Sequence, residues 1–262
     1  IEFENKFGEI NSFLLQKINV SVFKNPDELM KNILGVTDFL KKKIIKSGGD
    51  PDRECLTVIK TKDGQPFFYD ERFGHWRCYN YISDSYSIDF ISSPEVFMNA
   101  AKAFGKFQKM LSDYPIDTLY DTIPNFHNTS SRYADFINAV EQNLSGRLDT
   151  CLPEVEFAKA RKADADVLVN LLNKGKLPLR VTHNDTKLNN VMFDKASGES
   201  ICIVDLDTVM PGLSLYDFGD SIRFGANTAA EDERDLSKVS LDLELFELYV
   251  RGYLSQAGDS LT

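Results

Sequence analysis

The sequence has 262 residues and a net charge of −10, with 42% hydrophobic and 27% charged residues, which is ordinary for a globular protein with the core of one large or two small domains. So acidic a chain disfavours broad contact with nucleic acid or anionic lipid, and no apolar run approaches the ~20 residues of a membrane span, so we expect neither a nucleic-acid partner nor a membrane. The four cysteines (Cys55, Cys78, Cys151 and Cys202) lack C-x-x-C spacing, which argues against a zinc site or a disulfide framework and predicts buried thiols in a reducing cytoplasm.

The first ninety residues predict a small α+β unit. "INSFLLQKINV" (10–20) has the pattern of a strand, and a long helix is expected after it. Asn25 is its predicted N-cap, Pro26 suits the first helical position, and Gly48-Gly49 ends it. "CLTVIKT", "FFYD" and "HWRCYNYI" then predict short strands, with a turn at "KDGQP".

The polar connector "SDSYSID" separates two predicted domains, residues 1–83 and 84–262. After it the chain becomes helical, and Ser93 and Pro94 begin a helix over "SPEVFMNAAKAFGKFQKMLSDY". "SRYADFINAVEQNL" and "EVEFAKARKADADVLVNLLNKG" predict one helix each, and "LDLELFELYVRGYLSQAG" predicts another. A pair of strands around residues 179–205 interrupts these helices.

The most informative stretch is "VTHNDTKLNNVMFD" (181–194), which crowds polar side chains before a strand. "VMFD" and "ICIV" are strand candidates, and "KASGES" between them has turn chemistry, so the pair predicts an antiparallel hairpin. The start of its first strand lies beside the end of its second. Asn190 is therefore expected next to Asp205, with Asp185 on the same approach.

This set of side chains suits phosphoryl transfer. A carboxylate and an amide oxygen are ligands for Mg²⁺, a second carboxylate can take a proton from a hydroxyl, and Lys187 adds a positive charge for the phosphoryl group. Asp and Asn taken singly are common at turns and strand ends. The combination of "HND", Asn190 and "IVDLD" is too specific to be explained by turn chemistry.

"HNDTKLNN", "CIVDLDTVMPG" and "YDFGDSIRFGANTAAEDE" resemble the aminoglycoside phosphotransferase and choline kinase superfamily, and within it the bacterial N-acetylhexosamine 1-kinases. The match is densest from Arg180 to Glu233, and "LLQKINVSVFKNPDELMKNI" and "HWRCYNYI" match more weakly. The resemblance implies an α+β, bilobal, protein-kinase-like fold. Residues 1–83 would form a small β-rich N-lobe that holds ATP, and 84–262 a larger, mainly helical C-lobe that continues beyond Thr262.

Carried over position by position, the resemblance makes Asp185 the catalytic base and Asn190 and Asp205 the Mg²⁺ ligands. His183 matches a histidine of the catalytic loop that is usually a scaffold. Asp207 would be a secondary metal or substrate contact.

Two charged groups further along the chain are expected to be structural. Asp217 in "YDFGD" looks like the metal-binding motif of protein kinases, but it lies beyond the hairpin. We therefore expect Asp217 to brace the catalytic loop and Arg223 to pair with Asp220.

The resemblance also implies the residues that bind ATP. Lys17 is the match to the lysine that holds the α- and β-phosphates, and Glu28 would pair with it. The connector at Tyr81 and Ile82 would be the hinge that contacts adenine.

A kinase of this type also needs a glycine-containing loop over the ATP phosphates. The corresponding segment, "NKFGEINSFLLQKIN", contains one glycine, Gly8, and leaves no room for a hairpin. We therefore expect residues to be missing between Gly8 and Ser12.

The predicted function is that of a cytoplasmic, ATP- and Mg²⁺-dependent small-molecule kinase. The resemblance adds the acceptor, the anomeric hydroxyl of N-acetylglucosamine or N-acetylgalactosamine. Choline, homoserine or an aminoglycoside are alternative acceptors, and a nucleotide-binding pseudokinase that regulates a partner is an alternative of another class. A purely structural protein would leave the polar cluster at Asp185 unexplained.

Overall fold

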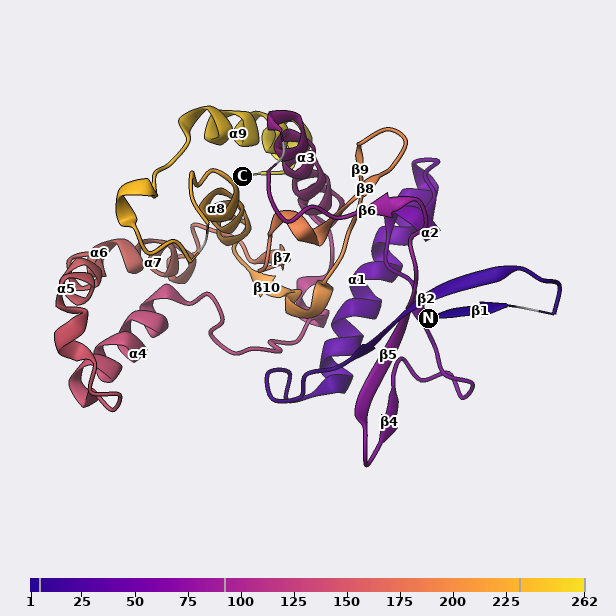
Figure 1. Ribbon diagram of the computed structural model, residues 1–262, viewed down its shortest axis with the longest axis horizontal. Helices are drawn as coiled ribbons and strands as arrows, with labels where there is room; N and C mark the ends of the chain where they lie inside the picture. The colour runs from indigo at the N-terminus through magenta and orange to yellow at the C-terminus, as the bar shows by residue number, and fades with distance from the viewer. Residues whose placement is uncertain (5, 92, 231, 262) are drawn as a thin grey trace. The chain divides into compact units, whose positions relative to one another are not determined.

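The computed structural model describes residues 1–4, 6–91, 93–230 and 232–261, and it joins small antiparallel sheets to a larger set of helices (Figure 1). The strands are β1 (Glu2–Glu4), β2 (Ile10–Lys17), β3 (Val58–Ile59), β4 (Phe68–Asp70), β5 (Gly74–Asn80), β6 (Ser85–Tyr86), β7 (Arg180–Thr182), β8 (Val191–Asp194), β9 (Ser200–Ile203) and β10 (Met210–Gly212). The α-helices are α1 (Pro26–Lys46), α2 (Pro51–Glu54), α3 (Pro94–Met110), α4 (Thr129–Gln142), α5 (Leu152–Ala160), α6 (Lys162–Ala165), α7 (Val167–Asn173), α8 (Ser214–Gly225) and α9 (Leu243–Ala257). Short 3₁₀ segments include η3 (Leu188–Asn190) and η4 (Leu206–Thr208). The predicted α+β class is confirmed.

The largest sheet is built around β5, which pairs with β2 along one edge and with β3 and β4 along the other. All of these pairs are antiparallel. Successive side chains of a strand point to opposite faces, so Arg77 and Tyr79 share one face of the sheet and Trp76 and Cys78 share the other. Arg77 and Tyr79 are both buried, so this face of β5 belongs to the interior.

The N-terminal strands form a hairpin, which corrects an expectation from the sequence. β1 and β2 are antiparallel, with Glu2 opposite Ser12 and Glu4 opposite Ile10. The described residues of the connecting turn include Gly8, whose positive φ of 82° glycine adopts without strain. β2 then continues unbroken to Lys17. The expectation that no hairpin fits here is therefore wrong, whereas the expected missing residues between Gly8 and Ser12 stay a prediction.

Helix α1 begins and ends where the sequence indicates. The Asn25 side chain accepts hydrogen bonds from the backbone N–H groups of Asp27 and Glu28 at 3.2 and 3.3 Å, and Pro26 is the first helical residue. The helix ends at Lys46 with Ser47 as its C-cap, and Gly48 follows with a φ of 80°. Its apolar face is buried at residues 29, 30, 33, 36, 40 and 44, which fixes the helix against its neighbours.

Helices α3 and α9 pack side by side and form the core of the helical part (Figure 1). A Cβ at Gly105 would lie 2.5 Å from the carbonyl oxygen of Tyr253, and one at Gly252 would lie 2.9 Å from that of Met98. Only glycine permits this approach of the two backbones. Most of the buried side chains in the resulting cluster come from α3, α9 and β8, and its members are Phe97, Ala100, Ala101, Phe104, Leu188, Val191, Phe193, Ala226, Tyr249, Tyr253 and Ala257.

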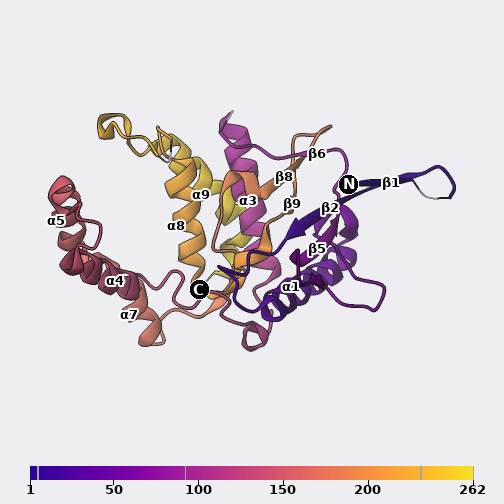
Figure 2. The ribbon, with the colours of Figure 1, turned by 60° about the horizontal axis from the view of Figure 1, so that its bottom comes forward.

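Strands β6, β8 and β9 form a small sheet next to α3 (Figures 1 and 2). β7 pairs with β10, so that Thr182 lies opposite Met210. The segment between β7 and β8 is therefore held between two pairs of strands.

Residues 123–179 form a compact unit of their own, which contains α4 to α7. The single helix predicted for "EVEFAKARKADADVLVNLLNKG" is wrong, because α5, α6 and α7 are separate. Thr129 donates its hydroxyl to the carbonyl of Ala165, and Ser130 donates to the carboxylate of Asp166 at 2.6 Å. These hydrogen bonds connect α4 to the junction between α6 and α7.

The rest of the chain, residues 1–122 and 180–262, forms the other compact unit. Both predicted lobes contribute to it, and the boundary predicted after Ser83 stays a prediction. Within the described ranges, no helix combines the length and the apolar character needed to cross a membrane.

Candidate active site

The predicted hairpin that follows the "HND" segment is confirmed. β8 and β9 are antiparallel, with Val191 opposite Ile203. At the open end, the N–H of Val204 donates to the carbonyl of Asn190 at 2.9 Å. The backbone of Asn190 therefore lies beside Val204, one residue before Asp205, as the sequence predicts.

Asp217 of α8 holds the loop between β7 and η3 in place through hydrogen bonds. This buried carboxylate accepts the backbone N–H of His183 and that of Asn184, both at 2.8 Å, and the side-chain amide of Gln108 at 3.0 Å. The carbonyl of Asp217 accepts the hydroxyl of Thr186 at 2.6 Å. Burial raises the pKa of Asp217, although His183 and the N–H donors lower it. Asp217 thus braces the loop, as predicted.

His183 is a scaffold residue, as expected. Its Nε2 lies 2.9 Å from the carbonyl of Val204 and must donate, while its Nδ1 accepts the N–H of Asp185 at 3.3 Å. The ring is fully buried and lies edge-on to Phe104 and Phe107. Both ring nitrogens are used within the protein, so His183 has no lone pair for a metal.

The predicted base, Asp185, lies among the predicted partners. Its Oδ1 is 3.4 Å from Nζ of Lys187, and its Oδ2 accepts from Nδ2 of Asn190 at 3.2 Å. The same Nδ2 donates to the carbonyl of Asp185 at 2.7 Å. The side-chain nitrogen of Asn190 is thus used in hydrogen bonds to the loop, while within the described ranges its Oδ1 makes no hydrogen bond. The Asp185 carboxylate itself stays partly exposed, with 32% of the side-chain surface accessible.

Asp205 adopts a left-handed backbone conformation, with φ and ψ both 57°. Asp and Asn tolerate this region better than other residues with a side chain, but it is sparsely populated and is often found at functional sites. Within the described part of the chain, the Asp205 carboxylate makes no hydrogen bond or ion pair. Oδ1 of Asn190 and the Asp205 carboxylate are therefore two oxygen donors that no described protein group occupies.

No group of three or more His, Cys, Asp or Glu side chains that could hold a metal occurs within the described ranges. The donor set is nevertheless suited to Mg²⁺, which is commonly held by one or two carboxylates together with water and substrate phosphates.

A cavity of about 230 Å³ extends from the end of this hairpin to the connector after β5. It brings the predicted adenine residues, Tyr81 and Ile82, into one site with Asp205. One part of its wall is apolar and another carries charged groups. The lining residues are Leu14, Gln16, Leu56, Arg77, Tyr79, Asn80, Tyr81, Ile82, Met192, Val204, Asp205 and Asp207.

The structure does not bring the predicted phosphate lysine to this cavity. Lys17 is exposed and is not among the lining residues. No ion pair joins Lys17 to Glu28 among the described residues, so their proposed pairing remains a prediction without geometric support.

The structure instead places Arg77 in the wall, a residue that the sequence reasoning missed. Nη2 of Arg77 lies 2.5 Å from Oδ1 of Asp207. The available signal was an arginine two positions before Tyr79 in the strand pattern "HWRCYNYI", on the inward side of the strand.

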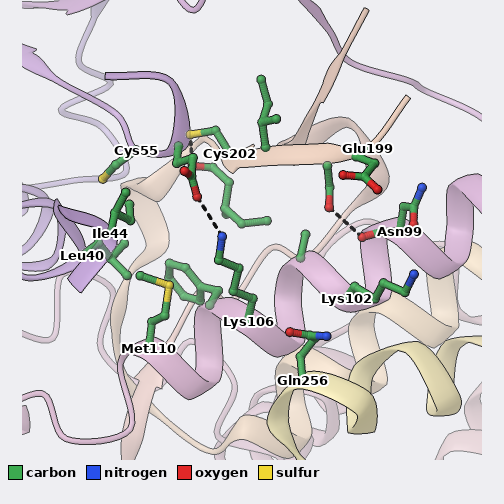
Figure 3. A pocket seen from close by; sticks show the side chains of 16 residues that line it. Leu40, Ile44, Cys55, Asn99, Lys102, Lys106, Met110, Glu199, Cys202 and Gln256 are labelled. Atoms are coloured by element: carbon green, nitrogen blue, oxygen red, sulfur yellow. Dashed lines mark hydrogen bonds and ion pairs between the residues drawn. The ribbon is translucent and has the colours of Figure 1, made fainter. Parts of the chain in front are cut away.

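A second cavity, of about 220 Å³, lies between α1, α3 and β9 and contains none of the predicted site residues (Figure 3). Lys106 in its wall is paired with Glu54 at 2.8 Å. Burial raises the pKa of the Cys55 thiol to about 12, and that of the buried Cys202 is raised for the same reason. These two thiols are therefore unreactive apolar groups, as the sequence predicts.

Comparison with known proteins identifies the family and the fold. The model of the phosphotransferase enzyme family, APH, matches residues 98–249. An aminoglycoside phosphotransferase from Alicyclobacillus acidocaldarius superposes with a TM-score of 0.55 and 12% identity, over 99% of this chain and 74% of that one. An amicoumacin kinase in complex with AMP-PNP and Ca²⁺ gives 0.56 and 12%, over 97% and 69%.

The choline kinase LicA of Streptococcus pneumoniae superposes with a TM-score of 0.50 and 11% identity, over 95% of this chain and 84% of that one. The fold is thus the protein-kinase-like fold of these enzymes. Because the family model covers more than half of the chain, the protein belongs to the APH family of phosphotransferase enzymes.

Proposed function

We propose that the protein transfers the γ-phosphoryl group of Mg-ATP to a hydroxyl group of a small molecule. The observation that carries this proposal is the open end of the β8–β9 hairpin. There Asp185 contacts Asn190, and the backbone of Asn190 is bonded to Val204, next to Asp205, beside the cavity that Tyr81 and Ile82 line. Metal, base and nucleotide positioning are the parts that phosphoryl transfer needs.

In this proposal Asp185 is the catalytic base. Its carboxylate is accessible to an incoming hydroxyl, and the hydrogen bond from Asn190 fixes its direction. Lys187, 3.4 Å from Oδ1 of Asp185, would stabilise the negative charge of the phosphoryl group during transfer.

Asn190 and Asp205 would hold the magnesium ion through the two oxygen donors described above. When bound, the ion would neutralise charge on the nucleotide phosphates. Asp207 is close to this position, but its carboxylate is engaged by Arg77.

The apolar part of the cavity suits adenine. Leu14, Leu56 and Met192 supply apolar surface, and Ile82 supplies a polar contact. The backbone N–H of Ile82 makes no hydrogen bond within the described ranges, while its carbonyl accepts from Ser85 at 2.6 Å. Ile82 is a buried residue in the cavity wall, so its N–H can donate to a ring nitrogen of adenine.

The acceptor that we propose is the anomeric hydroxyl of N-acetylglucosamine or N-acetylgalactosamine. Support for it comes from the sequence resemblance of "HNDTKLNN" and "CIVDLDTVMPG" to N-acetylhexosamine 1-kinases.

The buried thiols and the absence of a paired cysteine pattern support a cytoplasmic location.

The test is ATP consumption with a panel of acceptors: the two N-acetylhexosamines, glucose, choline, homoserine and an aminoglycoside. The N-acetylhexosamines should be better acceptors than glucose, because a pocket built for the acetamido group leaves polar atoms unpaired when that group is missing. Faster phosphorylation of choline, homoserine or the aminoglycoside would reassign the acceptor. ADP binding without turnover of any acceptor would favour the pseudokinase alternative.

Asp185→Asn tests the base separately. The variant should still bind Mg-ADP, yet lose about 10² to 10⁴-fold in turnover, the usual contribution of a positioned base. Asp164→Asn is the matched control, because the Asp164 side chain is 75% exposed and lies in the other compact unit. Turnover of Asp185→Asn close to that of the wild type would remove Asp185 from this role.

A further inference from the structure

A kinase of this type needs a cation on the sheet that meets the nucleotide phosphates. On the basis of the proposed ATP-dependent transfer, we propose that this cation is the guanidinium of Arg77 on β5, in place of the ammonium of Lys17 on β2. The geometry of the two strands and the unsatisfied donors of Arg77 lead to this assignment.

The register of β2 against β5 puts the two cations on opposite faces of the sheet. Lys17 lies opposite Trp76, and Gln16 lies opposite Arg77. Gln16 lines the cavity that contains Asp205, whereas Lys17 does not. A Cβ placed on Gly74 would lie 3.3 Å from Cε of Lys17, so the lysine stem runs over the turn between β4 and β5. Its ammonium group is therefore directed away from the metal ligands.

Arg77 is held in place by groups on its own face of the sheet. It is only 2% exposed, and its Nε and Nη2 both donate to Oε1 of Gln16, at 3.1 and 2.7 Å. Nη2 is also 2.5 Å from Oδ1 of Asp207, and the guanidinium carbon lies 5.3 Å from the centre of the Tyr79 ring. These contacts fix the plane of the guanidinium without using all of its donors.

Among the residues that the structure describes, Nη1 of Arg77 is buried without a hydrogen-bond partner. Oδ1 of Asp207, although close to Nη2, makes no hydrogen bond of acceptable geometry with any of them. Arginine stays protonated in proteins and carries five donors in a rigid fork. A buried donor left unsatisfied is costly, so a group with several acceptor oxygens is expected at Nη1. A phosphate matches that fork in geometry and in charge.

The position of Arg77 in the cavity agrees with the assignment. Arg77 shares the wall with Asp205, the proposed metal ligand, and Tyr81 and Ile82 belong to the same wall.

A purely structural role for Arg77, as the partner of Asp207, predicts a different result from the proposal. A structural arginine would stabilise the cavity for the whole nucleotide, so its loss would weaken adenosine and ADP equally. A phosphate-binding arginine would affect ADP alone. The quantity that separates the two is the ratio of the dissociation constants of adenosine and ADP.

This ratio is measured by calorimetry in EDTA, which removes any contribution of a metal ion. Arg77→Met should lower it by roughly 10- to 100-fold, the worth of charge-assisted hydrogen bonds to a phosphate, and Arg77→Lys should lower it less. Lys17→Met should leave the ratio unchanged, and so should Arg72→Met, the matched control with an exposed arginine in the turn between β4 and β5.

Arg77→Met leaves the Asp207 carboxylate buried without its partner, so that variant can fail to fold. Arg77→Met/Asp207→Asn, compared with Asp207→Asn alone, avoids this and should show the same fall in the ratio. An unchanged ratio in the double variant, or a fall in Lys17→Met instead, would overturn the assignment while the proposed kinase function stands. Wild-type protein that binds ADP no better than adenosine would overturn both.

Discussion

Replacing Asp217 by asparagine should weaken the hydrogen bonds that hold the loop between β7 and η3. The carboxylate serves three donors: Oδ1 accepts from Asn184, and Oδ2 accepts from His183 and Gln108. An asparagine of the same shape offers one oxygen, so at best it keeps two of these bonds and turns its NH₂ group toward the third N–H. A buried donor left unsatisfied costs about 1 to 3 kcal/mol. Burial raises the pKa of Asp217, so removing its charge recovers part of that cost.

We therefore expect Asp217→Asn to lower the free energy of unfolding by roughly 1 to 3 kcal/mol, as measured by denaturant titration. Asp185 follows two residues after His183, so a displaced loop should also lower kcat by roughly 10- to 100-fold, with a smaller change in the KM for ATP. Asp164→Asn, at an exposed side chain, should change stability by less than about 0.5 kcal/mol. An Asp217→Asn protein with wild-type stability and kcat would refute the reasoning, because the loop would then not depend on these bonds.

Three further results are expected. Gly225→Ala should lower the free energy of unfolding by roughly 1 to 3 kcal/mol, because the new Cβ would lie 2.1 Å from the ring of buried Phe97. The control is Gly219→Ala on the same helix, where a Cβ meets no described atom within 4 Å. Equal stabilities of the two variants would contradict this reasoning. The pKa of Asp194 is lowered from 3.8 to about 2, first by the backbone N–H of Ser197, so its contribution to stability is present above pH 3.8 and is lost as the pH falls toward 2. Asp194→Asn should therefore flatten the acid dependence of denaturant unfolding in that window, and an unchanged slope would exclude this cause. EDTA should abolish ATP-dependent turnover without changing the melting temperature, and turnover in EDTA would exclude a metal-dependent step.

The sequence predicted the site best where the chemistry is local. The cap at Asn25, the hairpin of β8 and β9 and the proximity of Asn190 to the end of that hairpin all follow from turn residues and strand patterns within a short stretch. The bracing role of Asp217 also followed, since its position beyond the hairpin excluded it as a metal ligand at the hairpin's open end.

The sequence failed where the outcome depends on which face of a strand a residue occupies. Lys17 and Gln16 are neighbours in β2, and a shift of one residue decides which of them faces the cavity. Only the pairing with β5 settles that choice, and β5 is far away in sequence. Arg77 was missed for the same reason, because an arginine in a strand pattern looks exposed until the sheet buries it.

The polar side chains of the loop have their hydrogen-bond partners within the protein, whereas some of those in the cavity wall do not. This difference separates the residues that hold the structure from those that can bind a ligand. His183 uses both ring nitrogens, and Asp217 uses both carboxylate oxygens, on groups of the protein itself. Groups satisfied in this way can hold structure but have nothing left to offer a ligand. By contrast, Nη1 of Arg77 is buried without a partner in the wall of a cavity, and the Asp205 carboxylate, in the same wall, makes no hydrogen bond or ion pair within the described ranges. An unsatisfied buried donor is rare because it is costly, so its persistence in the same cavity wall as this carboxylate is best explained by a ligand that carries both phosphate oxygens and a cation.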